Sequence, residues 1–283
     1  MDIQKKRVTI QGIAGCFHDA AAREYFEGEE IETVPYDTFN HMFEALESDA
    51  SLIGVVAIEN TIAGSILPNH ELLRHSQLQI IGEHKMRISH VLCALPGETL
   101  ESVREVNSHP MALMQCEQYL LRHPWMKMIE KFDTAGSAME IARDRLVNHA
   151  AVCGELAAEL YGLDILEKGI ETNKRNFTRF LVLADPLLAA EMAPSEKVID
   201  KASLVFTLPH TRGALSKILT ILAFYDINLS KIQSLPIVGR EWEYRFYVDV
   251  TFDSFVRYRQ AIDAVRPLIN DFKILGEYVE YKS

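Results

Sequence analysis

The sequence predicts a mixed α/β fold, and three observations lead to this prediction. In residues 1–185, short apolar runs of strand length alternate with amphipathic helical patterns, as in chains that build largely parallel sheets. From residue 202 onward, strand and helix patterns follow in the order βαββαβ. The chain has 283 residues, more than one hydrophobic core usually organises, so we expect more than one compact unit.

The first elements are read from the periodicity of apolar residues. Residues 8–11 predict a strand and residues 14–26 a helix, while the unbroken apolar run 52–58 predicts a strand that is buried on both faces. Asp37 or Thr38 can cap the helix between them. Its apolar residues recur at i, i+3, i+4 and i+7 and are Phe39, Met42, Phe43 and Leu46.

Three predicted strand ends carry polar side chains, and each is followed by a helix. They are residues 58–66, 103–110 and 128–137, with Asn60, Ser65, Ser108 and Thr134 among their polar residues. Ligands of open α/β sheets bind beyond the carboxyl ends of strands, where helix N-termini favour negative charge. A single hydroxyl at such a place is usually only a helix cap. Three such ends together favour a site for a small anionic ligand.

The pattern changes after residue 183, where we place a linker over residues 187–200. The remaining elements are a strand at 202–208, a helix from 213, strands at 227–237 and 242–252, a helix at 255–268 and a strand at 273–281. This order is the ferredoxin-like arrangement, which hosts many functions and does not identify one by itself.

Composition narrows the classes of partner. The formal net charge of -11 argues against nucleic acid, so a site for an anionic ligand needs a positive potential of local origin. The apolar runs are shorter than the roughly 20 residues of a membrane-spanning helix. The first ten residues carry Lys5, Lys6 and Arg7 without the apolar segment of an export signal, so we expect a cytoplasmic protein.

Cysteine and histidine spacing predicts neither a metal site nor a cofactor site. The four cysteines are far apart in the sequence, and buried thiols are the expected state. The ten histidines form no HExxH pattern.

Residues 176–180, Asn-Phe-Thr-Arg-Phe, place a hydroxyl beside a guanidinium at the start of a predicted strand. Strand alternation directs Thr178 and Phe180 to one face and Arg179 to the other. Thr178 and Arg179 therefore share a site only if the start of the strand is irregular.

This run resembles the Thr-Arg-Phe signature of the prephenate dehydratases, and further segments follow in the order of that family. Residues 11–18 resemble its first glycine loop, residues 58–65 its glutamate-asparagine-serine segment, and residues 108–116 and 133–136 two more segments. The resemblance covers nearly the whole chain. The departures are Cys16, His18 and Thr61, which replace a threonine and two serines.

The resemblance implies that prephenate loses its ring carboxylate as CO2 and its 4-hydroxyl as water, giving phenylpyruvate. It implies two lobes like those of periplasmic binding proteins, residues 1–84 with 171–186 and residues 85–170, which close around the substrate. Thr178 then polarises the departing oxygen, and Arg179 binds a substrate carboxylate. The other implied site residues are Asn60, Thr61, Ser65, Ser108, Thr134 and Phe177.

Two further residues have open roles. His109 is either catalytic or part of a helix cap. Glu59 is a poor proton donor, because a carboxylate that faces a dianion repels it unless it is protonated.

The same resemblance implies that residues 201–283 form an ACT regulatory domain that binds phenylalanine and pairs with other copies into a dimer or tetramer. The implied phenylalanine-binding residues are Gly213, Ala214, Leu215, Asn228, Leu229, Gln233, Ser234 and Leu235. Family members often carry Glu-Ser-Arg-Pro where this chain reads Gln-Ser-Leu-Pro at 233–236, which weakens the expectation of phenylalanine inhibition.

Three alternative functions remain open. An arogenate dehydratase performs the same chemistry on an aminated substrate. A non-catalytic solute receptor has the same bilobed design but leaves the C-terminal unit unexplained. A catalytically silent phenylalanine sensor does not need Thr178 or Arg179.

Overall fold

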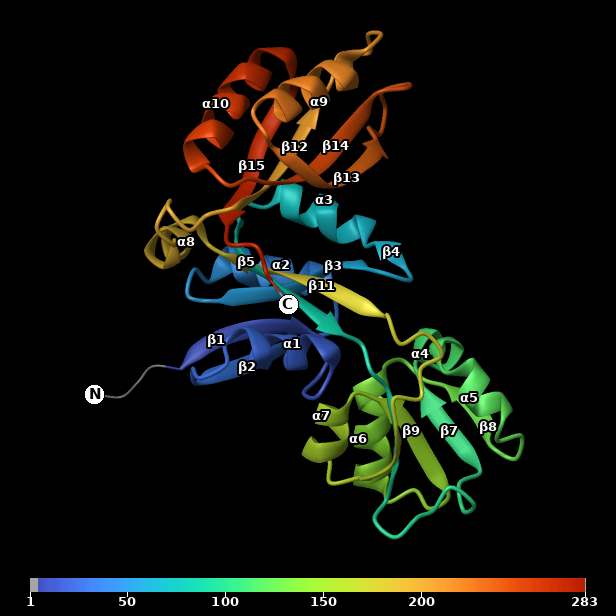
Figure 1. The fold of residues 1–283 in the computed structure, drawn as a ribbon. Coiled ribbons are helices and arrows are strands. Elements are labelled where there is room, and N and C mark those ends of the chain that lie inside the picture. Colours follow the sequence, from blue (N-terminus) through green and yellow to red (C-terminus); the bar gives the residue numbers. More distant parts are fainter. Residues whose placement is uncertain (1–4, 283) are drawn as a thin grey trace. The chain divides into compact units, whose positions relative to one another are not determined.

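The computed structural model describes residues 5–282, which form a mixed α/β protein with three β-sheets (Figure 1). The first sheet has the strand order β2-β1-β3-β11-β5, with β4 paired to β3. Its strands are β1 (Lys6–Gln11), β2 (Ile31–Tyr36), β3 (Ile53–Asn60), β4 (Gly64–Ser65), β5 (Gln79–Arg87) and β11 (Phe177–Ala184). The helices between these strands are α1 (Phe17–Tyr25), α2 (Phe39–Ser48) and α3 (Leu67–His75).

The second sheet has the order β10-β6-β9-β7-β8. Its strands are β6 (Val91–Ala94), β7 (Glu105–Ser108), β8 (Lys127–Glu130), β9 (His149–Cys153) and β10 (Asp164–Lys168). The helices around it are α4 (Pro110–Gln115), α5 (Glu117–Leu121), α6 (Thr134–Asp144) and α7 (Glu155–Leu160). Strand β7 is parallel to β8 and β9, but β6 is antiparallel to β9 and β10, so this sheet is mixed rather than largely parallel as predicted.

The third sheet is antiparallel, with the order β13-β14-β12-β15. Its strands are β12 (Lys201–Thr207), β13 (Asn228–Pro236), β14 (Tyr244–Thr251) and β15 (Asn270–Tyr278). Helices α9 (Ala214–Phe224) and α10 (Phe255–Val265) cover one face, where Ile218, Ile262 and Val248 belong to one buried core (Figure 1). The predicted βαββαβ order is therefore present.

Local sequence explains most helix boundaries. Thr38 Oγ1 accepts a hydrogen bond from the N–H of His41, which confirms one of the two expected caps of α2. Asp185 caps α8 (Pro186–Met192), a short helix that begins one residue before the predicted linker, by accepting from the N–H of Leu187. The helix expected around residues 112–120 is divided into α4 and α5 at Cys116, and α10 ends in a 3-10 turn, Arg266–Leu268.

Two compact units are found within the described residues. Unit 1 contains the described residues up to 42, residues 54–64 and residues 85–180, and unit 2 contains residues 43–53, 65–84 and those from 181 onward. The domain boundaries expected from the sequence, 1–186, 187–200 and 201–283, stay a prediction. Their outermost residues, 1–4 and 283, lie outside the described part of the chain.

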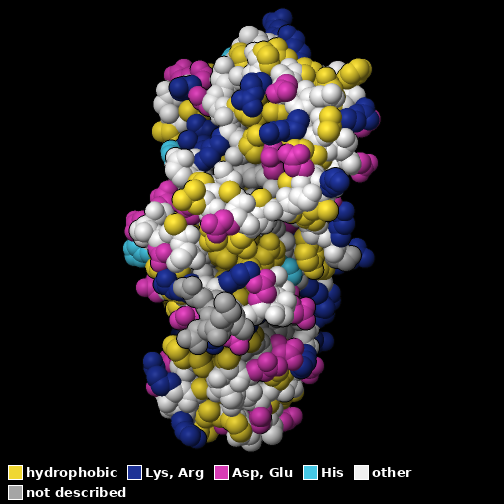
Figure 2. All heavy atoms as spheres, turned by 90° about the vertical axis from the view of Figure 1, so that its left-hand side faces the viewer, with side chains coloured by type: hydrophobic (Ala, Val, Ile, Leu, Met, Phe, Trp, Pro, Cys, Tyr) yellow, Lys and Arg dark blue, Asp and Glu magenta, His cyan; other side chains and the backbone are white. Residues whose placement is uncertain are grey.

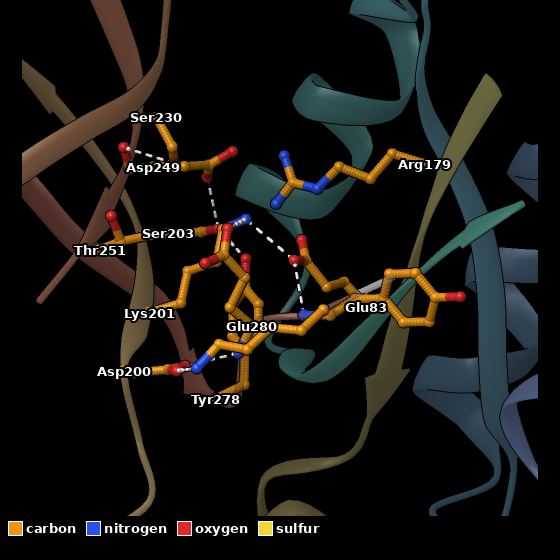
Figure 3. A network of polar contacts seen from close by, with 12 residues as sticks. Glu83, Arg179, Asp200, Lys201, Ser203, Ser230, Asp249, Thr251, Tyr278 and Glu280 are labelled. Atoms are coloured by element: carbon orange, nitrogen blue, oxygen red, sulfur yellow. Dashed lines mark hydrogen bonds and ion pairs between the residues drawn. The ribbon is translucent and has the colours of Figure 1, made fainter. Parts of the chain in front are cut away.

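In unit 2, strand β5 packs against the antiparallel sheet through charged and backbone contacts. Lys201 is the first residue of β12 and is buried. Its Nζ lies 2.9 Å from Glu83 Oε1 and 3.4 Å from Glu280 Oε1 (Figure 3). The same Glu83 oxygen accepts from the N–H of Tyr281 at 3.1 Å. At Gly276, a Cβ atom would lie 2.3 Å from the carbonyl oxygen of Ile80, so only glycine permits this approach of β15 to β5.

Charged side chains of both signs lie on the surface (Figure 2), whereas the thiols are buried. On the face drawn in Figure 2, acidic and basic side chains are interspersed. All four cysteines are buried free thiols, as predicted, and burial raises the pKa of the Cys16 thiol to about 12. Within residues 5–282, the helices are all too short or too polar to span a bilayer.

Candidate functional site

Asn60, the last residue of β3, is the centre of the candidate site. Its side-chain nitrogen Nδ2 donates to Asn176 Oδ1 at 2.8 Å, to the Phe177 carbonyl at 3.2 Å and to Thr178 Oγ1 at 2.9 Å. Because three acceptors share two N–H groups, at least one of these hydrogen bonds is bifurcated. One carboxamide thus joins the end of β3 to the start of β11.

The other end of the Asn60 amide is held by its own loop. Oδ1 accepts hydrogen bonds from the backbone N–H groups of Ile62 and Ala63, both at 2.9 Å. Such side-chain turns are typical of asparagine at strand ends. These two donors assign the oxygen to the loop and leave the nitrogen directed at Thr178.

Thr178 is 8% exposed, and its hydroxyl oxygen is the acceptor of the Asn60 N–H group. A hydroxyl has one hydrogen to donate in addition to its two acceptor lone pairs. Because Asn60 occupies an acceptor position, the hydrogen of Thr178 is left to donate. The local geometry therefore prepares Thr178 as a hydrogen-bond donor.

Thr61 and Phe177 hold the start of β11 in place. The Thr61 hydroxyl donates to the Arg175 carbonyl at 3.0 Å and accepts from the Phe177 N–H at 2.9 Å. The Thr61 N–H donates to the Phe177 carbonyl at 2.9 Å. Both hydrogen-bonding directions of this hydroxyl are used, which gives Thr61 a positioning role in this geometry.

Arg179 is not brought to the same place as Thr178. Strand β11 is regular from Phe177, so alternation turns Arg179 to the opposite face. There its guanidinium nitrogen NH1 lies 3.9 Å from Glu59 Oε2. The neighbouring residues of the two strands, Asn60 and Thr178, contact each other on the other face. A catalytic role that Arg179 shares with Thr178 stays a prediction, and this geometry does not favour it.

A chain of hydrogen bonds continues from Asn60 to Gln115 at the end of α4 and to His90 just before β6. Asn176 is fully buried and donates through Nδ2 to Gln115 Oε1 at 3.2 Å. His90 Nε2 lies 2.9 Å from the same oxygen, and it must be the donor because an amide oxygen only accepts. Burial lowers the pKa of His90, so its imidazole is neutral at pH 7.

Glu171 connects the two chain segments that join the first and second sheets. Glu171 is 2% exposed, and its carboxylate accepts hydrogen bonds from Arg87 at 2.8 Å and from the N–H of His90 at 3.0 Å. Lys174 Nζ lies 3.6 Å away. Although burial raises the pKa of Glu171, these donors and charges together lower it below its usual value.

Unit 1 has two halves, one with strands of the first sheet and one with the second sheet. The first glycine loop, in the first half, contacts helix α7 of the second half. Gly15 has a φ of +85°, its N–H donates to the buried Asp19 carboxylate at 2.8 Å, and a Cβ atom there would lie 2.8 Å from Ala157 Cα. The Tyr161 hydroxyl donates to the Ala14 carbonyl at 2.7 Å. The two halves of unit 1 therefore touch at this loop, with no space for a side chain at Gly15.

His18 lies on α1 of the same half. Its Nε2 accepts from the N–H of Ala57 at 3.3 Å, and its ring stands edge-on to Phe39 and to Phe180. This apolar surrounding lowers the pKa of His18 to about 4. The imidazole is neutral at physiological pH and holds β3 rather than supplying positive charge.

The predicted polar residues on the second sheet have local partners. Ser108 is completely buried and donates to the Val152 carbonyl at 2.6 Å, which ties β7 to β9. His109 is the N-cap of α4, and its Nδ1 accepts from the N–H of Met111 at 3.1 Å. Of the two roles expected for His109, catalysis or helix capping, the structure shows the capping contact.

Thr134 and Ser65 complete the predicted set. Thr134 is the first residue of α6, whose cap is the Asp133 carboxylate that accepts from the Gly136 N–H. Ser65 is half-buried on β4. The structure thus joins Asn60, Thr61, Phe177 and Thr178 by direct hydrogen bonds, whereas Ser108, His109 and Thr134 have other partners or positions. The functional roles of all of these residues stay predictions.

Sequence reasoning did not select four residues that the structure connects to Asn60. They are Asn176, Gln115, His90 and Glu171. Asn176 and Gln115 do lie in segments that resemble the family, and a carboxamide in such a segment is the available signal. For His90 and Glu171, the sequence alone offers no signal, because their partners are 25 and 84 residues distant along the chain.

Comparison with curated proteins gives consistent relatives. The chain is 37% identical over 285 residues to arogenate dehydratase/prephenate dehydratase 2, chloroplastic, of Arabidopsis thaliana. The aligned region covers 96% of this chain and 72% of that protein. It is also 37% identical over 291 residues to arogenate dehydratase 1 of Petunia hybrida, covering 96% of this chain and 66% of that protein. The chain therefore spans about two thirds to three quarters of the length of these relatives.

Comparison with solved structures agrees. Prephenate dehydratase of Arthrobacter aurescens, described in complex with L-Phe, matches with a TM-score of 0.83 and 28% identity over 96% of this chain and 90% of that one. A structure described as a novel type of quorum quenching acylase matches with a TM-score of 0.84 and 29% identity over 97% and 98% of the two chains.

The family description that matches the sequence itself is prephenate dehydratase, over residues 8–186. This range contains the Asn60 network, the Glu171 contacts and the Gly15 loop. With that match and relatives at 37% identity over nearly its whole length, this chain belongs to the prephenate dehydratase family.

Proposed function

We propose that this chain catalyses the decarboxylating dehydration of prephenate to phenylpyruvate, a carbon–oxygen lyase reaction of phenylalanine biosynthesis. The observation that carries the proposal is the 2.9 Å hydrogen bond from Asn60 to Thr178, which leaves the threonine hydroxyl ready to donate. Membership of the family supports the same assignment.

In this reaction, the bond between the ring and its carboxylate breaks, and its electron pair enters the ring as the C–O bond to the 4-hydroxyl breaks. CO2 leaves, and the departing hydroxyl takes up one proton and leaves as water. The ring becomes aromatic. Negative charge develops on the departing oxygen, so a donor positioned there stabilises the transition state. A threonine hydroxyl is a weak acid, and we assign Thr178 this hydrogen bond rather than the net proton transfer.

The test is phenylpyruvate formation by the parent, Thr178→Ala and Thr178→Ser. Removing one transition-state donor lowers kcat about 10²–10³-fold, so we expect that loss for Thr178→Ala and a much smaller one for Thr178→Ser, which keeps the hydroxyl. Phenylpyruvate is read by its enolate absorbance in alkali. A Thr178→Ala variant that turns over prephenate like the parent would remove Thr178 from the mechanism.

Arogenate is the second candidate substrate, because curated relatives carry the name arogenate dehydratase. Arogenate has an amino group where prephenate has a keto group, and it yields phenylalanine. Since specificity is a ratio of kcat/KM values, both substrates must be assayed with one preparation. A higher kcat/KM for arogenate would replace the first proposal and keep the role of Thr178.

An acylase activity, named for one similar structure, is less well supported. Amide hydrolysis needs a nucleophile or a water molecule that a base activates. The contact found for the Thr178 hydroxyl is the Asn60 amide N–H, which is a donor and not a base. Incubation with a quorum-sensing acyl amide serves as the comparison assay.

For residues 201–283 we propose an ACT regulatory unit with phenylalanine as effector, bound by the predicted residues of 213–215, 228–229 and 233–235. Gly213 supports this in part, since it starts α9 in the left-handed conformation at φ +75°. The L-Phe complex of the similar structure gives a second argument. Phenylalanine should therefore change kcat or KM for prephenate, and titration with phenylalanine tests this.

We also propose self-association through β13, an edge strand of the third sheet. Its residues alternate between exposed and half-buried, and Ile232 is 44% exposed. An unpaired edge is a template for pairing with a second copy. Light scattering of Ile232→Lys beside the parent tests this, and an unchanged mass above that of one chain would argue for another interface.

A further inference from the structure

A cavity of about 480 Å³ lies in unit 2 between α3 and the β13–β14 hairpin. It is within the size range of small-molecule sites. One part of its wall is apolar and consists of Leu67, Pro68, Leu235, Pro236, Ile237 and Val238. The charged or titratable residues of the wall are Glu71, Arg74, His75 and Arg245, and His75 Nε2 contacts Arg74 NH2 and lies 3.6 Å from Glu71 Oε2.

Positive charge exceeds negative charge at this cavity. Glu71 Oε2 accepts from Arg74 at 2.9 Å, and Glu71 Oε1 lies 3.5 Å from Arg245 NH1. The Tyr247 hydroxyl also donates to Glu71. Although burial raises the pKa of Glu71, the hydrogen bonds and the two guanidinium charges lower it below its usual value, so this carboxylate is ionised at pH 7. Two guanidinium groups therefore share one carboxylate, and one positive charge is in excess.

The donors are also incompletely used. Arg74 Nε is buried and has no hydrogen-bond partner among the described residues. A buried N–H group without an acceptor is unfavourable, and native structures rarely keep one without a reason. Arg245 is only 13% exposed in its side chain, and its contact with Glu71 is an ion pair at 3.5 Å. The site thus combines a desolvated positive charge with an apolar wall.

We propose that this cavity binds a small carboxylic acid with an apolar body. Its carboxylate meets the guanidinium groups of Arg74 and Arg245, for which carboxylates are geometrically matched partners. Its apolar body lies against the wall formed by α3 and the hairpin. Of the residues proposed above for phenylalanine, Leu235 is the one that lines this cavity. The other lining residues belong neither to the proposed phenylalanine site nor to the Thr178 network.

The probe for the test is 3-phenylpropionate, and the comparison ligand is 3-phenylpropanol, which has the same body without the charge. Binding to the full chain is measured by calorimetry. We expect saturable binding of the acid and at least about tenfold weaker binding of the alcohol, since the alcohol cannot form a charge-assisted pair. Equal binding of acid and alcohol would overturn the proposal.

Two variants and two matched controls place the binding site. Arg245→Gln removes one guanidinium, and Val238→Asp adds a negative charge at a residue that is 99% exposed and tolerates a polar side chain. Each should weaken binding of the acid about tenfold or more. Arg240→Gln, on the same hairpin but paired with Glu243, and Val256→Asp, exposed on α10, should bind like the parent. Unchanged binding in Val238→Asp and Arg245→Gln would place the acid elsewhere and refute this site. The measurement needs no turnover, so its result is independent of the proposed reaction.

Discussion

At the scale of single residues, the side-chain amide of Asn60 decides what Thr178 can do. One threonine hydroxyl is an ordinary surface feature, but its oxygen here receives an N–H from an amide whose own oxygen is held by two backbone donors. The hydroxyl thus accepts from an N–H group whose direction is fixed by the loop. This preorganisation is the kind that contributes in a transition state and needs no rearrangement during the reaction.

Replacing Asn60 by aspartate tests the role of its N–H group, because the two side chains have nearly the same shape. The carboxylate accepts the loop N–H groups but has no N–H to donate to Thr178, and it adds negative charge near an anionic substrate. We expect kcat for prephenate to fall about 10²-fold or more. Thr61→Ser, which keeps the hydroxyl that bridges Arg175 and Phe177, is the control and should retain activity within about threefold. Parent-like turnover by Asn60→Asp would contradict the role of the amide.

His18 makes a prediction about pH. Its pKa in the folded chain is about 4, below the usual value of 6.5, because the folded surroundings exclude water from the ring. Between these two pH values the unfolded chain binds the proton and the folded chain does not, so stability falls as the pH falls from 6.5 to 4. One such group contributes at most about 1.4 kcal/mol per pH unit to the slope.

Urea unfolding of the parent and His18→Gln across this range measures the effect. The parent should lose free energy of unfolding more steeply than the variant below pH 6.5. His90, whose pKa is also lowered by burial, contributes to both proteins alike. NMR titration of the His18 ring in the parent gives a second answer, and a midpoint near 6.5 would show that the ring is solvated.

At the scale of elements, the strands carry the site and the connections between sheets hold it in register. Strand β3 ends at Asn60 and β11 begins at Phe177, so the hydrogen bonds between them join residues more than 110 positions apart. The two connecting segments are tied by Glu171, and also by the Ile88 N–H to the Asn176 carbonyl at 2.8 Å. These ties hold Asn176 where it meets Asn60.

Glu171→Gln should therefore affect both stability and catalysis. The glutamine keeps the shape but loses the charge that pairs with Arg87, and hydrogen bonds to charged groups contribute about 1.5–3 kcal/mol. We expect the free energy of unfolding to fall by about 1–2 kcal/mol at pH 7, with a lower kcat/KM. Because the pKa of Glu171 is lowered by folding, the difference from the parent should shrink as the pH falls below about 4.5.

The control for Glu171 is Glu167→Gln, an exposed residue of the preceding strand β10. It should leave unfolding and kcat/KM close to those of the parent, since exposed charges contribute little. Equal losses in both variants would mean that general charge, and not the contacts of Glu171, is responsible.

At the scale of the whole molecule, the relation between the two halves of unit 1 is the property to test. Gly15 and Gly28 both have a φ of +85°, but a Cβ atom at Gly15 would lie 2.8 Å from Ala157 Cα, whereas at Gly28 no atom lies within 4 Å. Alanine at either position carries the same left-handed strain. Only Gly15→Ala also separates the glycine loop from α7.

We expect Gly15→Ala to lower kcat/KM for prephenate at least about tenfold relative to Gly28→Ala, because a displacement of about 1 Å disturbs the reacting geometry. Small-angle scattering with and without a substrate analogue then tests closure of the two halves. The parent should become more compact on binding, and Gly15→Ala should not. Identical kinetics in the two alanine variants would show that the contact at Ala157 has no catalytic role.

The sequence by itself determined the α/β class, the βαββαβ order and the family, and it selected Asn60 and Thr178 as candidate site residues. These follow from local periodicity and from short motifs whose residues are neighbours in the chain. Tertiary structure decided what depends on distant residues. It joined Asn60 to Thr178, gave Arg179 its partner Glu59, bonded the buried Ser108 to the Val152 carbonyl, and brought Gln115, His90 and Glu171 to the connection behind Asn60. The physical reason is that alternation fixes the face of a strand on which a side chain lies, whereas its partner and its burial depend on strand register and on residues far along the chain, which no local pattern encodes.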